Sequence, residues 1–263
     1  MDRYPLNLIL AVATASAMVF LGFLPTKSIR TAFFAKETFT AAASWLAVAF
    51  LSPYSIIHFP IIIALICLAA SWHFHSDRVL SGKMWLNLAS GLGISIGVML
   101  ILAVTPRGYP PGLPQLHEIL LLVSIYLGGG LIGLAYFCLL LTESASGRSG
   151  VTNALVQRHV GLLPWLTLAR MVVLFILAAG TSRIQGPSKP YDNTLSETMN
   201  ALYLGIIPRH VLFLIGLTFV LLIFACLAQR ATRLDSRILP TRYLRALLII
   251  GFITEFLARA FVL

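Results

Sequence analysis

The sequence predicts an all-α protein: a polytopic transmembrane helix bundle that forms a single integral membrane domain over residues 1–263. Composition supports this prediction, because 59% of the residues are hydrophobic, only 11% are charged and the mean hydropathy is +0.91. A soluble domain is closer to half apolar and a quarter charged. In addition, the apolar residues form long runs separated by short polar loops, as in chains that cross a bilayer repeatedly.

Six apolar runs have the length of a membrane span, which is roughly 20 residues. The first run is also longer than the apolar region of a typical signal peptide, so we expect it to be the first span. The six predicted spans are 5–24, 84–104, 119–141, 161–180, 205–229 and 243–262.

The stretch 38–74 is too long for one span and slightly short for two. Pro53 lies in its middle, and a proline interrupts a helix by removing one hydrogen bond and clashing with the preceding turn. We therefore expect two helices, 38–52 and 55–73, and about eight spans in total. The alternative is one helix over 38–74 and seven spans.

The basic residues of the loops favour eight spans. With eight spans, eleven Lys or Arg residues fall on one side of the membrane and four on the other; with seven spans the division is nine to six. Positive loops face the cytoplasm, so both termini are expected outside. The eleven are Lys27, Arg30, Lys36, Arg78, Lys83, Arg148, Arg158, Arg230, Arg233, Arg237 and Arg242, and the four are Arg3, Arg107, Arg183 and Lys189.

This distribution also argues against nucleic-acid binding, although the formal net charge is +10. The basic residues are spread over short loops as orientation signals rather than gathered in one patch. The three cysteines, Cys67, Cys138 and Cys226, lie within apolar runs and form no Cys-x-x-Cys pair. We therefore expect neither an iron–sulfur cluster in this chain nor a disulfide framework.

A glycine-rich segment lies in the middle of the predicted span 119–141. Gly128, Gly129 and Gly133 lie within it, and the last two are four residues apart. Small residues at this spacing let membrane helices approach closely. We interpret them as helix-packing residues, with room for a flat ligand as the alternative.

Three ionisable residues fall inside predicted spans and should face the bundle rather than lipid. Glu255 and Arg259 are four residues apart and share one helix face. Arg170 lies within 161–180 and needs a partner, for which Glu255 is one candidate. The set is interpreted either as a structural ion pair or as the border of a polar cavity used by protons or a quinone.

Another group of polar residues falls on the predicted outer side. His58 can take a proton near neutral pH, and Arg107 and Glu118 lie on the same side. These three are the candidate quinol-binding residues. The sequence shows no pair of histidines deep in facing spans, so we expect no haem b site. No third ligand joins His73 and His75, so no metal site is expected.

The sequence resembles the membrane-anchor subunits of the DMSO reductase family. The resemblance covers about a third of the chain and departs from the family at the loop around His58, which is contracted and not followed by a glutamate. It rests on the opening 3–23, on Arg107-Gly108-Tyr109, Leu127-Gly128-Gly129 and Gly133 within 101–141, and on Glu255, Arg259 and Phe261 near the end.

The resemblance implies eight spans with both termini outside and a role in a membrane-bound oxidoreductase complex. It implies two partners, an iron–sulfur subunit and a molybdopterin catalytic subunit, and electron exchange with menaquinol. The chain itself would carry no covalently bound cofactor. The basic segment 230–245 is the expected docking site for the iron–sulfur subunit. A transporter or ion-pathway protein, and a haem b anchor that oxidises quinol, remain the alternatives.

Overall fold

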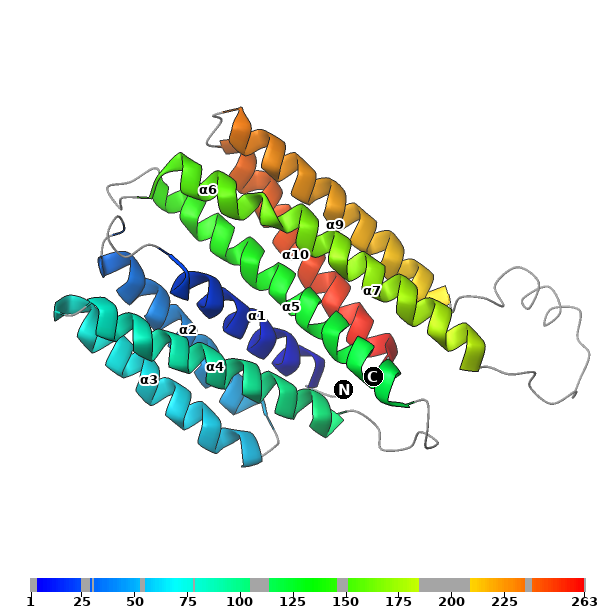
Figure 1. Cartoon of the computed structure of the whole chain (residues 1–263), viewed down its shortest axis with the longest axis horizontal. Helices are drawn as coiled ribbons and strands as arrows, with labels where there is room; N and C mark the ends of the chain where they lie inside the picture. Colours follow the sequence, from blue (N-terminus) through cyan, green and yellow to red (C-terminus); the bar gives the residue numbers. More distant parts are fainter. Residues whose placement is uncertain are drawn as a thin grey trace, which may run out of the picture.

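The protein is a bundle of long helices in a computed structural model (Figure 1). The structure describes residues 4–24, 29, 31–52, 55–77, 79–104, 114–145, 151–184, 209–234 and 238–262. Within these ranges the backbone is helical apart from short turns and contains no strand, which confirms the all-α prediction. The helices are α1 (Tyr4–Gly22), α2 (Thr31–Leu51), α3 (His58–Asp77), α4 (Val79–Val104), α5 (Pro114–Ala145), α6 (Asn153–Val160), α7 (Leu162–Ile184), α9 (Arg209–Arg233) and α10 (Ile238–Val262).

Two groups of helices make up the bundle, and α1 joins them. Helices α1 to α4 pack together as one group, and α5, α6, α7, α9 and α10 form the other. Helix α1 contacts α2 and α4 on one side and α5 and α10 on the other. Helix α2 packs on α1 and α3, so its face toward α5 is not covered by close helix packing.

Small residues explain how α1 fits between two neighbours. On α5, a Cβ atom at Gly133 would come within 2.5 Å of the carbonyl oxygen of Ala13 in α1. On α4, a Cβ atom at Gly93 would come within 3.1 Å of the Cβ of Ala15. Glycines therefore allow α4 and α5 to approach opposite faces of α1, as small residues do in membrane bundles.

The stretch 38–74 forms two helices, as the eight-span prediction requires. Helix α2 ends at Leu51, where the Ser52 amide still donates to the Val48 carbonyl at 3.0 Å. A 3-10 turn over Ser55–Ile57 then leads directly into α3. Pro53 lies outside the described residues. Helix α2 begins at Thr31, seven residues before the predicted position, because an apolar run marks only the most hydrophobic part of a helix.

Helix α6 was not predicted from the sequence. The Thr152 hydroxyl caps its start by accepting a hydrogen bond from the Leu155 amide at 3.3 Å. The helix buries Val156, His159 and Val160. The segment mixes polar and apolar residues and contains no long hydrophobic run. Hydropathy alone therefore does not predict a helix here.

Among the described residues, four helical segments are long and apolar enough to cross a membrane. Two shorter apolar helices, Leu6–Gly22 and His58–Phe74, accompany them. The four segments are Gly82–Leu100, Leu122–Ala145, Asn153–Leu177 and Phe213–Arg233. These lengths and compositions agree with a membrane protein.

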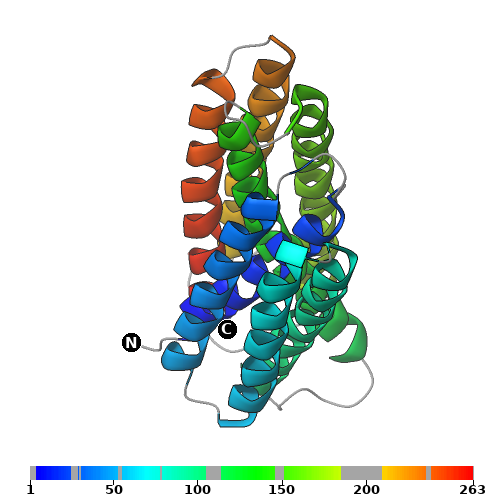
Figure 2. The same ribbon diagram turned by 90° about the vertical axis from the view of Figure 1, so that its left-hand side faces the viewer.

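The two ends of the bundle differ in which helix termini they gather. Helices α1, α3, α5 and α9 finish at one end, where α2, α4, α6 and α10 begin, and the opposite end holds the start of α1 and the finish of α10 (Figures 1 and 2). We call the first the basic end, because most of the Lys and Arg residues near helix termini lie there. Those whose side chains the structure describes are Lys36, Lys83, Arg158, Arg230, Arg233, Arg242 and Arg245.

Polar contacts tie neighbouring helices together at the basic end. The Lys83 ammonium of α4 donates to the Leu24 carbonyl just after α1, at 2.9 Å. The Gln157 amide of α6 donates to the Thr232 carbonyl of α9 at 3.1 Å. Both bonds satisfy carbonyl groups that a helix C-terminus leaves without an internal partner.

Candidate functional site

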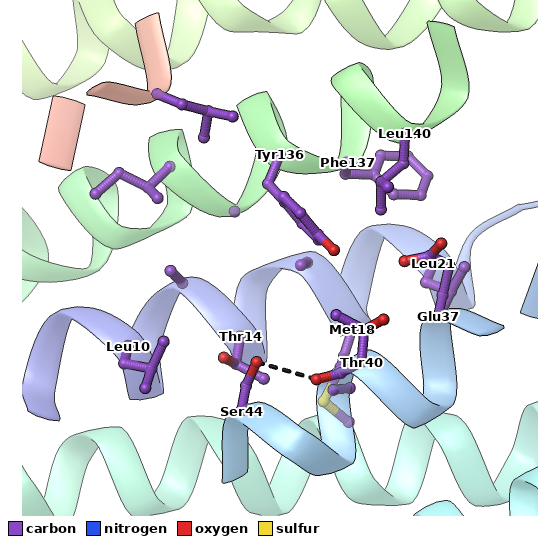
Figure 3. Close-up of a pocket in the computed structure, with 16 residues that line it drawn as sticks. Leu10, Thr14, Met18, Leu21, Glu37, Thr40, Ser44, Tyr136, Phe137 and Leu140 are labelled. Carbon is purple, nitrogen blue, oxygen red and sulfur yellow. Dashed lines mark hydrogen bonds between the residues drawn. The ribbon is translucent and has the colours of Figure 1, made fainter. Parts of the chain in front are cut away.

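A cavity of about 260 Å³ lies where the two groups of helices meet, between α1, α2 and α5 (Figure 3). We call it the joint cavity. Its size is close to the lower end of the range for small-molecule pockets, about 300–1,000 Å³. Its lining residues are Leu10, Ala13, Thr14, Ala17, Met18, Leu21, Glu37, Thr40, Ala41, Ser44, Ile132, Gly133, Tyr136, Phe137, Leu140 and Leu248.

The joint cavity exists because α2 packs against α1 and α3 instead of α5. On its α1 wall, the small side chains of Ala13 and Ala17 do not reach across the gap. On its α5 wall, Gly133 has no side chain and sits against the α1 backbone. The single residue from α10 is Leu248, which is half-buried at the edge of the cavity.

Polar groups in the joint cavity gather on α2 and on the facing side of α5. Glu37 is only 6% exposed, although it carries an ionisable carboxyl group. Across the cavity, the Tyr136 hydroxyl lies beside the Thr40 side chain and interacts electrostatically with Glu37. Figure 3 shows the Tyr136 hydroxyl pointing toward α2 and the Glu37 carboxylate at the same end of the cavity.

Threonine and serine hydroxyls along α2 are already engaged with their own helix. The Thr40 hydroxyl donates to the Lys36 carbonyl at 3.1 Å, and the Ser44 hydroxyl donates to the Thr40 carbonyl at 3.0 Å. Such bonds to the preceding turn are common for these residues in helices. The groups left to meet a ligand are therefore the Glu37 carboxyl, the Tyr136 hydroxyl and the Thr14 hydroxyl of α1.

This arrangement suits a lipophilic ligand with oxygen atoms at its head. Apolar walls favour a ring or chain, and a few convergent polar groups fix its orientation. The carboxyl group can accept or donate a proton, and the tyrosine hydroxyl can donate a hydrogen bond. Nothing in the lining favours a large hydrophilic molecule.

A second polar cluster lies in the other group of helices. Arg170 of α7 forms a salt bridge with Glu255 of α10, and the two side chains are 1% and 2% exposed. Gly128 of α5 faces the same carboxylate, since a Cβ atom there would collide with it. The cluster thus links three helices, and its two charges compensate each other away from water.

The structure places the ion-pair residues predicted from the sequence as follows. Arg170 and Glu255 are brought together, and Glu255 was one of the candidate partners considered for Arg170. The side chain of Arg259 lies outside the described residues, although its backbone belongs to α10. Gly129 packs against Val12 of α1 and Gly133 against the α1 backbone, whereas Gly128 faces Glu255.

Of the three candidate quinol residues, the structure describes the side chain of His58. His58 begins α3, and its Nε2 atom lies 3.2 Å from the Ala49 carbonyl oxygen near the end of α2. Glu37 lies near the start of α2, and His58 is not among the residues that line the joint cavity. Arg107 and the side chain of Glu118 lie outside the described residues.

Sequence reasoning missed Glu37, Tyr136 and the pair Gly93/Gly97. Glu37 lies between the loop residue Lys36 and the predicted span 38–52, so it belongs to neither of the features that the sequence singles out. The signal for the glycine pair was present, since Gly93 and Gly97 are four residues apart like Gly129 and Gly133. Tyr136 is one aromatic among many in the sequence, and only the fold shows that it faces Glu37.

No family model matches the chain, and neither the curated proteins nor the solved structures contain a match to it. Among the described residues, no group of three or more His, Cys, Asp or Glu side chains is placed to hold a metal ion.

Proposed function

We propose that this protein is the membrane-anchor subunit of a molybdopterin/iron–sulfur oxidoreductase and exchanges electrons with the (mena)quinone pool. The observation that carries the proposal is the joint cavity. It is an apolar slot within a membrane bundle, and it presents a carboxyl group and a tyrosine hydroxyl at one end. The sequence resemblance to DMSO reductase anchor subunits points to the same class of ligand.

A quinol matches the joint cavity in its chemistry. Its ring is flat and apolar, its isoprenoid tail is soluble in lipid, and its two oxygens need hydrogen-bond partners. The ring would lie against Ala13, Ala17 and Gly133, where the walls are smallest. One oxygen would meet Glu37 and Tyr136, and the tail would leave toward Leu10 and Ile132.

The position of the joint cavity supports electron transfer to a partner at the basic end. Its polar residue Glu37 lies in the second turn of α2, close to the end where α2 begins. Arg230 and Arg233 end α9, and Arg242 follows in the first turns of α10. These guanidinium groups would dock an acidic surface of the iron–sulfur subunit, and the molybdopterin subunit would bind beyond it.

The proposal places the protein in a bacterial inner membrane with the basic end in the cytoplasm, because positive loops face that side. Both termini would then face the periplasm, since α1 begins and α10 finishes at the opposite end (Figure 1). In this account the chain supplies a ligand site and a docking face, and the redox centres belong to its partners.

Affinity purification from native membranes in mild detergent tests the proposal. We expect two companion polypeptides in stoichiometric amounts, together with bound iron, acid-labile sulfide and molybdenum. A triple substitution of Arg230, Arg233 and Arg242 to Gln should release both companions while leaving the chain in the membrane. Isolation of the wild-type chain without any companion would contradict the proposal and favour a transporter.

A further inference from the structure

Glu37 differs from the other buried carboxylate in how its charge is balanced. Glu255 is paired with Arg170 inside the bundle. Among the described residues, no Lys or Arg side chain forms a salt bridge with Glu37, which is nevertheless 6% exposed. A buried carboxylate without a counter-ion is unfavourable, so a carboxyl group at this site favours binding a proton when the cavity offers one.

Among the described residues, the charged and titratable neighbours of Glu37 are few. On α2 the adjacent residue Lys36 interacts with it electrostatically but is exposed, because successive helix residues point in different directions. On α5 the titratable neighbour is Tyr136. The α1 residues facing this part of the cavity are Met18 and Leu21, which do not ionise.

Glu37 also lies close to a route to water. It is the seventh residue of α2, so it is roughly 9 Å along the helix axis from the first residue, at a rise of about 1.5 Å per residue. The helix start belongs to the basic end, where the bundle meets its polar surroundings. The carboxyl group thus lies between an apolar ligand space and the nearest polar boundary.

We propose that Glu37 is the proton-accepting residue of the joint cavity. This inference rests on the proposed function. In the step assigned to it, the O–H bond of one quinol hydroxyl breaks and its proton binds the Glu37 carboxylate, which gives a quinol anion and a carboxylic acid. No electron moves in this step. Glu37 releases this proton at the basic end. The anion then gives two electrons to the iron–sulfur partner and its remaining hydroxyl proton to Glu37, which leaves the quinone.

Tyr136 has a supporting part in the same step. Its hydroxyl can donate a hydrogen bond to the quinol oxygen and stabilise the negative charge that develops as the proton leaves. Thr40 of α2 lies beside the Tyr136 hydroxyl. Glu37 is therefore the residue whose replacement should separate binding from turnover.

The test uses the intact complex and the variants Glu37→Gln, Glu37→Asp and Glu143→Gln. Glu143 is the matched control, because it is an exposed glutamate of α5 paired with Arg245. Binding is measured by fluorescence quenching of a hydroxyquinoline N-oxide, a quinol analogue. Turnover is measured as oxidation of a water-soluble menaquinol analogue, after the companion subunits have been shown to co-purify with each variant.

We expect Glu37→Gln to bind the analogue within about threefold of wild type, and to lose quinol oxidation by on the order of 100-fold, the usual contribution of a general base. Glu37→Asp should recover part of this activity, and Glu143→Gln should behave as wild type. Unchanged turnover in Glu37→Gln would overturn the assignment. Equal loss of binding and turnover in both the Gln and Asp variants would also overturn it, because it would indicate a structural role.

Chemical labelling provides a readout that does not depend on turnover. A hydrophobic carbodiimide adds to a protonated carboxyl group from the lipid phase and rearranges to a stable N-acylurea. Mass spectrometry should locate the adduct on Glu37 and not on Glu143, and the hydroxyquinoline N-oxide should prevent it. Absence of label on Glu37 would contradict the proposal. Failure of the wild-type complex to bind the analogue at all would instead remove the proposed function, and this role with it.

Discussion

The carboxylate of Glu255 occupies the space that a side chain at position 128 would need. It reaches this place from α10 and is held there by the Arg170 guanidinium of α7. Gly128 lies in the middle of α5, where a glycine would otherwise only weaken the helix. The absence of a side chain is therefore part of the ion-pair site, which joins α5, α7 and α10 through one contact.

Replacing Gly128 by Ala should destabilise the bundle by about 1–3 kcal/mol, because the new methyl group forces the carboxylate away from Arg170. The measurement is detergent-solubilised thermal unfolding followed by tryptophan fluorescence. Gly216→Ala in α9 is the matched control, since no atom lies within 4 Å of the added Cβ there. That variant should be neutral or slightly more stable, and an equal loss in both variants would contradict this role of Gly128.

Replacing one member of the buried ion pair should reduce the stability of the protein more than replacing both members. Arg170→Met or Glu255→Leu alone leaves one uncompensated charge inside the bundle, with an expected loss of about 3–5 kcal/mol. The double variant removes both charges, and with them the Arg170 Nε and Nη1 atoms, which have no acceptor among the described residues. It should lose less stability than either single variant. Additive losses would contradict the coupling, and the same thermal unfolding assay distinguishes the two results.

Tyr136→Phe should weaken quinol-analogue binding about 2- to 10-fold, because one hydrogen bond contributes about 0.5–1.5 kcal/mol. The ring remains in place, so the fold should not change. Tyr243→Phe is the control, since Tyr243 lies beside Phe224 and does not line the joint cavity. Equal affinity of both variants for the hydroxyquinoline N-oxide would remove Tyr136 from the ligand site.

His58→Ala should leave analogue binding unchanged. The His58 ring lies against the Ala49 carbonyl near the end of α2, whereas Glu37 lies near its start. The expected effect is a small loss of stability from one interhelical contact. A large loss of affinity in the fluorescence titration would move the ligand site to the α2–α3 turn and restore the sequence-based quinol candidate.

The helical architecture was accessible from sequence because membrane spans leave long apolar runs. The break near Pro53 and the charge asymmetry of the loops predicted two helices over 38–74, and the structure has them. Helix ends were less predictable, since α2 and α5 continue past their apolar runs into residues such as Lys36 and Glu37. The amphipathic helix α6 has no such run, so hydropathy does not predict it.

The candidate site was much harder to predict from the sequence than the helices were. Arg170 and Glu255 are conspicuous because a charge within a span needs a partner, and this reasoning named Glu255 as one candidate partner of Arg170. Glu37 and Tyr136 are 99 positions apart in the chain, and neither belongs to a motif. They face each other across the joint cavity because α2 does not pack closely against α5. The separation of these two helices depends in turn on how α1 packs against its neighbours.

The measurement that tests the account most directly is titration of the hydroxyquinoline N-oxide into the complex with the joint cavity filled. Ala17→Phe places a ring in the cavity from α1, and Ala43→Phe places the same ring on an exposed face of α2 as the control. The account predicts that Ala17→Phe abolishes saturable quenching while Ala43→Phe binds like wild type. Undiminished binding in a folded Ala17→Phe complex would contradict it.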